Sequence, residues 1–289
     1  RELARQALEA GLALLDGQGQ DIELAHLYQE MGRLLFRSGD NAGAIVWAER
    51  ALAEAERLVP RAGQSEAALE ETGREAAAAV SHAYNTLGVA LARVERLDEA
   101  VRHIEQSVRV AETHGLLQVA CRGYANLSVL YSTVDPGQAI ETCRQGLELA
   151  KKIGDPAFQS RLYTNLAVAY CALTNRCDGD GMAAAQAAIE LDRQLGELDH
   201  LAVPLIVLGQ IYQCHGQPDL ALRYYREALA LAEEVGEPQL LFPCYDGLAT
   251  LHLELEDVAG AETYMRKARE VCERAGVDPD SLTVLPFLA

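Results

Sequence analysis

Apolar and small residues return along the chain at spacings that predict helices packed against helices. Six segments place a bulky residue, a Leu or Met three positions later, a small residue next, and another large residue three positions after that. These segments are Tyr28-Met31-Gly32-Leu35, Tyr84-Leu87-Gly88-Leu91, Tyr124-Leu127-Ser128-Tyr131, Tyr163-Leu166-Ala167-Tyr170, Leu205-Leu208-Gly209-Tyr212 and Tyr245-Leu248-Ala249-His252. Spacings of three, one and three put all four residues on one side of a helix. The small residue marks the place where a neighbouring helix comes close.

A second helical pattern follows each of these segments. About twelve residues after the small residue there is an Ala, and seven later another small residue, as in Ala100 with Ser107 and Ala221 with Ala228. Polar turns such as 38–41 and 215–218 separate the two patterns, and Gly-containing turns such as 153–156 and 235–238 follow the second. Each unit is therefore predicted to be an antiparallel helical hairpin, whose open apolar face must stack on neighbours.

The repeated pattern resembles the tetratricopeptide repeat family over roughly residues 22–275. The small residues at 32, 88, 128, 167, 209 and 249 are separated by 56, 40, 39, 42 and 40 positions, whereas the usual period of the family is about 34 residues. The extra residues amount to about one and a half helical turns, so longer helices are expected. This long form is similar to arrays attached to bacterial signalling ATPases, nucleotide cyclases and transcription regulators.

The predicted fold is all-α, an α–α solenoid of about six hairpins with a partial one before them. We expect a single domain over residues 1–289, with the six hairpins in 22–275. Residues 1–16 are predicted to form the second helix of the partial N-terminal repeat. The long interval in the second unit predicts a turn at 60–63 followed by an extended first helix. The apolar tail 276–289 is not helical in pattern and is expected to cap the last hairpin.

Charge and composition narrow the range of partners. The chain has 43 acidic and 25 basic residues, a net charge of −18, which disfavours binding to nucleic acid or to anionic membranes. The amino end lacks the basic flank and cleavage site of a signal peptide. The odd count of seven Cys, without a CxxC pair, forms no disulfide framework. A cytoplasmic location is expected.

Catalytic motifs do not stand out in the sequence. We find no phosphate-binding loop, no HExxH and no convincing set of nucleophile and base, so the chain is expected to be no enzyme and to need no metal or cofactor. Most of the Cys are expected to be buried as small apolar residues. A remote alternative is a metal-binding protein, because Cys171 and Cys177 could hold zinc together with Cys214 and His215 from the next hairpin.

The resemblance implies a concave groove lined by the first helices of successive hairpins. Positions six before, three before, one after and five after the small residue are then expected to face inward. The first four units place five Arg and no acid there, which suits carboxylates or phosphates through two-pronged hydrogen bonds. The alternative is that these Arg pair with Glu on neighbouring helices. The predicted peptide-binding residues are Arg33, Arg37, His82, Asn85, Arg93, Arg122, Asn126, Arg161, Asn165, Val203, Ile206 and Gln210.

Some members of the family grip a terminal carboxylate with Lys, Asn, Asn, Lys and Arg on three consecutive hairpins. Asn126 and Arg161 match that set, but Asn85, Val89 and Asn165 depart from it, which argues against the standard clamp. The hypothesis is a protein- or peptide-binding scaffold, a regulatory module of a larger bacterial signalling protein, that docks an acidic segment followed by apolar anchors near Val203 and Ile206. A structural module that self-associates into a homo-oligomer is the alternative.

Overall fold

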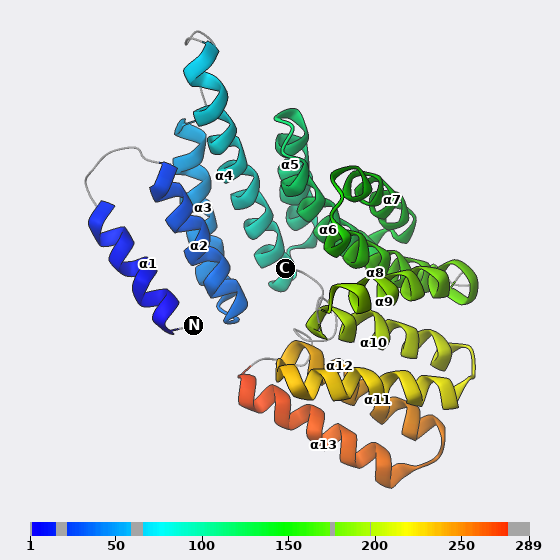
Figure 1. Cartoon of the computed structure of the whole chain (residues 1–289). Coiled ribbons are helices and arrows are strands. Elements are labelled where there is room, and N and C mark those ends of the chain that lie inside the picture. The colour runs from blue at the N-terminus through cyan, green and yellow to red at the C-terminus, as the bar shows by residue number, and fades with distance from the viewer. Residues whose placement is uncertain (1, 16–21, 59–65, 174–176, 197, 277–289) are drawn as a thin grey trace. The chain divides into compact units, whose positions relative to one another are not determined.

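The computed structural model describes residues 2–15, 22–58, 66–173, 177–196 and 198–276. Every regular element within these ranges is helical, so the all-α prediction is confirmed. The helices, seen in Figure 1, are α1 (Glu2–Leu15), α2 (Ile22–Arg37), α3 (Asn41–Leu58), α4 (Glu66–Arg93), α5 (Leu97–Thr113), α6 (Leu117–Val134), α7 (Pro136–Ile153), α8 (Pro156–Ala172), the π-helical turn η1 (Cys177–Gly181), α9 (Met182–Leu195), α10 (Leu198–Cys214), α11 (Pro218–Val235), α12 (Pro238–Glu254) and α13 (Val258–Ala275).

The chain divides into two compact units, residues 1–130 (unit 1) and 131–288 (unit 2). The boundary falls inside α6, whose last four residues belong to unit 2. The single domain over 1–289 therefore stays a prediction, and the two units are described separately. Among the described helices, none has an apolar stretch long enough to span a membrane.

Unit 1 contains α1 and two hairpins, α2 with α3 and α4 with α5. The first helices α2 and α4 also contact each other, and α3 packs on α4, which gives the two layers expected of stacked hairpins. The helix predicted over 1–16 is present as α1 and packs on α2. The extended first helix predicted for the second hairpin repeat is confirmed as the 28-residue α4. The turn predicted at 60–63 lies outside the described residues.

Unit 2 repeats the same arrangement. Helix α7 packs on α8, and the hairpins of α8 with α9, α10 with α11 and α12 with α13 follow. The first helices α8, α10 and α12 contact one another in succession, and η1 packs on α8, α9 and α10. The tail predicted to cap the last hairpin lies, beyond Gly276, outside the described residues.

The turns form where the sequence places glycine and aspartate. Gly154 ends α7 with a φ of 70°, in the left-handed region that favours glycine. The next residue, Asp155, caps α8 by accepting a hydrogen bond from the backbone N–H of Phe158 at 3.0 Å, and Pro156 occupies the first turn. A chain that stops one helix and starts the next within two residues must fold back as a tight hairpin.

The small residues of the repeat are packed as their spacing predicts. A Cβ placed on Gly32 would lie 3.4 Å from the backbone of both Ala44 and Ala48 on α3. On Gly88 it would meet the backbone carbonyl of Ala100 at 3.0 Å as well as the side chain of Ile104. The helices of the second hairpin therefore approach too closely at Gly88 for a Cβ, and those of the first bring backbone into van der Waals contact at Gly32, which agrees with the register read from the sequence.

Candidate functional site

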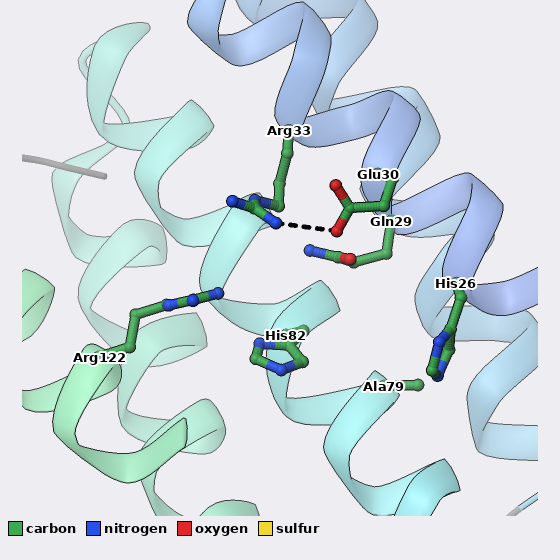
Figure 2. A pocket seen from close by; sticks show the side chains of 7 residues that line it. All are labelled: His26, Gln29, Glu30, Arg33, Ala79, His82 and Arg122. Carbon is green, nitrogen blue, oxygen red and sulfur yellow. Dashed lines mark hydrogen bonds and ion pairs between the residues drawn. The ribbon is translucent and has the colours of Figure 1, made fainter. Parts of the chain in front are cut away.

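A pocket of about 240 Å³ opens between α2, α4 and the part of α6 that belongs to unit 1. It is lined by His26, Gln29, Glu30 and Arg33 of α2, Ala79 and His82 of α4, and Arg122 of α6. Figure 2 shows the side chains of Arg33, His82 and Arg122 converging on this space from three different helices. The α-helical period explains the set, because residues three, four or seven apart share one side of a helix.

The two guanidinium groups of the pocket differ in their hydrogen-bond partners. Arg33 Nη1 donates to Glu30 Oε1 at 2.8 Å, and both side chains remain partly exposed. Arg122 has no hydrogen-bond or ion-pair partner among the residues that the structure describes. Burial, and then the positive charge of Arg33, lower the pKa of Arg122, although a guanidinium stays protonated at neutral pH. The pocket therefore holds a partly buried cation that feels the charge of Glu30 but forms no direct ion pair among the described residues.

His82 adds a second polar group that lacks a partner. Its side chain is half-buried, and Nδ1 is buried without a hydrogen-bond partner within the described part of the chain. Burial, followed by the charges of Arg122, Arg33 and His26, lowers the pKa of His82 to about 4. The imidazole is consequently neutral at pH 7, and one of its nitrogens can donate a hydrogen bond to a ligand.

The size and charge of the pocket restrict what it can hold. Pockets for whole small molecules usually measure about 300–1,000 Å³, so this one suits a single functional group at the end of a larger ligand. Its lining provides two guanidinium groups and two imidazoles against one carboxylate, Glu30, which already pairs with Arg33. Planar guanidinium groups match the two oxygens of a carboxylate. An acidic group fits best.

The structure brings together only part of the predicted binding set. Arg33, His82 and Arg122 line the pocket. Arg37 is exposed at the last position of α2, and the guanidinium of Arg93 lies 5.2 Å from the ring centre of Phe36. Arg161 belongs to unit 2, so the predicted basic stripe over four hairpins stays a prediction.

Four predicted groove residues are buried instead of open to a ligand. They are Asn85, Asn126, Asn165 and Ile206. The exposed inward position expected from counting is wrong for Asn85 and Ile206, whereas Asn126 and Asn165 entered the predicted set through the comparison with the family's carboxylate clamp. Asn126 Nδ2 donates to Asn85 Oδ1 at 3.1 Å, which ties α6 to α4. Positions two or three before the small residue thus face a neighbouring helix. Ile206 is only 2% exposed and Val203 is half-buried, so these two side chains pack mainly in the core and leave little apolar surface for a ligand. Gln210 is exposed.

Sequence reasoning missed the acidic group in the pocket. The inward positions of the first four repeats contained no acid by counting, yet Glu30 turns toward Arg33 from a neighbouring position on α2. The signal was available, because a Glu and an Arg three residues apart on a helix commonly pair. The alternative that groove Arg pair with nearby Glu therefore holds for Arg33, but it does not hold for Arg122 among the described residues.

A second polar cluster lies in unit 2, at the end of α8. Cys177 Sγ lies 2.9 Å from His215 Nε2, and Cys171 forms a side-chain hydrogen bond with Cys177. Burial and the neighbouring Cys177 raise the pKa of Cys171 to about 12. These are residues of the zinc alternative, but among the described residues no group of three His, Cys, Asp or Glu is arranged to hold a metal ion.

Comparison with known protein families decides the class of the repeat. Sequence profiles described as tetratricopeptide repeat match residues 80–114, 181–234 and 244–275. Tetratricopeptide repeats are therefore present in these three segments of the chain. The matched residues lie on α4 with α5, on α9 to α11, and on α12 with α13, which are segments where the small-residue pattern was found. No curated protein matches the chain in sequence.

Solved structures share the fold of this repeat protein at low sequence identity. Aspartyl phosphate phosphatase F from Bacillus subtilis is 13% identical with a TM-score of 0.72, over 95% of this chain and 67% of that one. The Rap conjugation gene regulator of plasmid pLS20, solved with the Phr* peptide, is 12% identical with a TM-score of 0.60, over 89% and 76%. A signal transduction ATPase with a tetratricopeptide repeat sensor from Pyrococcus horikoshii is 17% identical with a TM-score of 0.55, over 87% and 40%.

Proposed function

We propose that this tetratricopeptide repeat protein is a recognition module, without catalytic activity of its own, that binds an acidic segment of another protein or peptide. The pocket of unit 1 takes a carboxylate of that segment. The observation that carries the proposal is the partly buried guanidinium of Arg122, which forms no hydrogen bond or ion pair with a carboxylate among the described residues and points toward Arg33 and His82 (Figure 2).

The physical argument is the cost of an unpaired buried charge. Removing a guanidinium from water without a partner is unfavourable, and a ligand carboxylate offsets that cost with charge-assisted hydrogen bonds. Arg122 supplies a two-pronged donor, Arg33 can share its donors between Glu30 and the ligand, and His82 adds a neutral N–H. The chain as a whole carries a net charge of −18, so this local group of cations has the opposite charge to most of the protein.

The fold supports a peptide as the larger ligand. The Rap regulator that shares the fold was solved with a peptide, and the ATPase carries its repeats as a sensor. We propose by extension that the chain is a regulatory module of a larger signalling protein and acts in the cytoplasm. Self-association is the alternative, and sedimentation of the chain at several concentrations measures it directly.

The test is a selection from a random peptide display library on the intact chain. We expect the selected peptides to be enriched in Asp, Glu or a free terminal carboxylate, and their affinities to fall as salt is raised. Arg122→Ala should weaken binding of a selected peptide by about 10–100-fold, because a hydrogen bond to a charged group contributes about 1.5–3 kcal/mol. Arg122→Lys should restore part of the affinity, since it keeps the charge but not the fork.

The matched control is Arg109→Ala, which removes the same charge from an exposed position on α5 of the same unit. It should change the affinity by less than about twofold, as surface charges contribute little. Peptides without acidic enrichment, or equal effects of Arg122→Ala and Arg109→Ala, would show that the pocket is not the binding site. Phosphorylated versions of the same peptides establish whether a phosphate is preferred to a carboxylate.

A further inference from the structure

Three separate elements of unit 2 bring thiols and an imidazole together. Cys171 lies in the last turn of α8, Cys177 begins η1, and His215 directly follows α10. The turn η1 packs on both α8 and α10, and Cβ of Cys177 lies 3.4 Å from where a Cβ on Gly181 would be, beside Tyr170 of α8. The contact depends on the stacking of two hairpins and not on a short sequence motif.

The pair of Cys177 and His215 has the geometry of an activated thiol. Cys177 Sγ and His215 Nε2 lie 2.9 Å apart, so the imidazole can accept the thiol proton. An adjacent imidazole favours the thiolate, which is the nucleophilic form of cysteine. Cys177 keeps 9% of its surface exposed, which leaves room for a small reactant but not for a bulky one.

We propose that Cys177 is a peroxide-sensitive modification site, in which His215 positions and activates the thiol and Cys171 closes a disulfide. The oxidant is a hydroperoxide. The Cys177 thiolate attacks one peroxide oxygen, the O–O bond breaks, and the leaving oxygen takes the proton held by His215, which leaves a sulfenic acid and water or an alcohol. The Cys171 thiol then attacks the sulfenic sulfur, forms the S–S bond and releases the sulfenic oxygen as water.

The two cysteines differ in a way that assigns their order. Cys177 faces the imidazole, whereas Cys171 faces Cys177, and burial raises the pKa of the Cys171 thiol to about 12. A thiol that holds its proton is a poor first nucleophile. Cys171 is therefore the second thiol to react, and the disulfide fixes η1 on the last turn of α8. The neighbouring Cys214 is exposed, and burial together with Cys177 raises the pKa of its thiol.

The test treats the reduced, purified chain with hydrogen peroxide and follows each thiol by peptide mass spectrometry. We expect the wild-type chain to lose two hydrogen atoms and to yield a peptide pair joined through Cys171 and Cys177. Cys171→Ser should instead accumulate a sulfenic acid on Cys177, trapped by a cyclic 1,3-diketone. Cys143→Ser, which removes a buried thiol of the same unit outside the cluster, should behave as the wild type.

His215→Gln separates activation from structural support. If His215 activates Cys177, the rate of Cys177 oxidation should fall by roughly tenfold, because the acceptor of the thiol proton is gone, while the thermal stability of the chain stays that of the wild type. If His215 only holds the structure, its loss should expose the cluster and make Cys177 react faster. The proposal is overturned by that faster reaction, by an unchanged rate, or by a disulfide that joins Cys177 to Cys214 instead of Cys171.

Discussion

In unit 1, Gly88 of α4 lies against Ile104 of α5, whereas in unit 2 the matching Gly209 of α10 lies against the ring of Tyr225 on α11. Both partners are fully buried. A Cβ on Gly88 would also meet the backbone carbonyl of Ala100 at 3.0 Å, but the three atoms nearest to a Cβ on Gly209 all belong to the Tyr225 ring. The same repeat position is thus bounded by a side chain together with backbone in one unit and by a single side chain in the other.

The difference shows that the two helices of a hairpin can pack closely around the small residue through different neighbouring residues. The Tyr225 ring also lies against Gly247 of α12, so one side chain packs two successive first helices, and its hydroxyl donates to Gln213 Oε1 at 2.8 Å. The polar chemistry of the two units differs as well, with guanidinium and imidazole groups gathered in unit 1 and thiols in unit 2. The small residues maintain the close packing of the helices in each repeat, and the residues around them determine which polar groups each unit presents.

The largest effect is expected from Tyr225→Ala. Removing a fully buried aromatic ring leaves a cavity against both Gly209 and Gly247, and should lower the free energy of unfolding by about 3–5 kcal/mol in urea titrations. Tyr225→Phe keeps the ring and loses only the bond to Gln213, so about 1 kcal/mol is expected. Equal losses for the two variants would mean that the hydroxyl, not the ring, holds the hairpins together.

A smaller effect should distinguish the two glycines. Gly88→Ala forces a Cβ against the Ala100 backbone and Ile104, and we expect a loss of about 1–3 kcal/mol. Gly209→Ala should cost less, because its Cβ would come no closer than 3.0 Å to the Tyr225 ring, whereas a Cβ on Gly88 would overlap the Ile104 side chain and also meet backbone. Gly179→Ala, where a Cβ would meet nothing within 4 Å, is the control. If Gly209→Ala is the more harmful, the contrast between backbone and side-chain contacts is wrong.

The smallest effect concerns the pocket imidazole of unit 1. The pKa of His82 is lowered from 6.5 to about 4, so the unfolded chain binds the proton first as the pH falls. Stability should therefore decrease from pH 7 toward pH 4, and His82 should account for about 1–2 kcal/mol of the loss at pH 5. The charged or titratable groups that face it are Arg33, His26 and Glu30 of α2 and Arg122 of α6.

Urea unfolding of the wild type and of His82→Gln at pH 7 and pH 5 measures the contribution of His82 to the loss of stability. That contribution is the difference between the pH dependences of the two proteins. His26→Gln, which removes an exposed imidazole from the same pocket, serves as the control. A pH dependence that is identical in the wild type and in His82→Gln would contradict burial of a neutral imidazole at this position.

The hairpins could be predicted because their causes are local. A period of 3.6 residues, an Asp at a helix start and a Gly at a helix end act within a few residues, and the helices appear where these signals stand. Counting from the small residue also found Arg33, His82 and Arg122. It failed for Asn85, since its burial depends on how closely α4 and α6 approach, and for Glu30, whose rotamer turns it toward Arg33.

The sequence by itself determined the class of repeat, the register of its helices and the residue types that face inward, because each follows from spacing along the chain. Only the tertiary structure decided which of those residues share a pocket and which are consumed by packing. Arg122 meets His82 and Arg33 only when three hairpins stack, and Cys177 meets His215 only when η1 packs between α8 and α10. The physical reason is that charge and thiol chemistry depend on distance and burial, and contacts between residues about 40 positions apart are set by the stacking of whole helices.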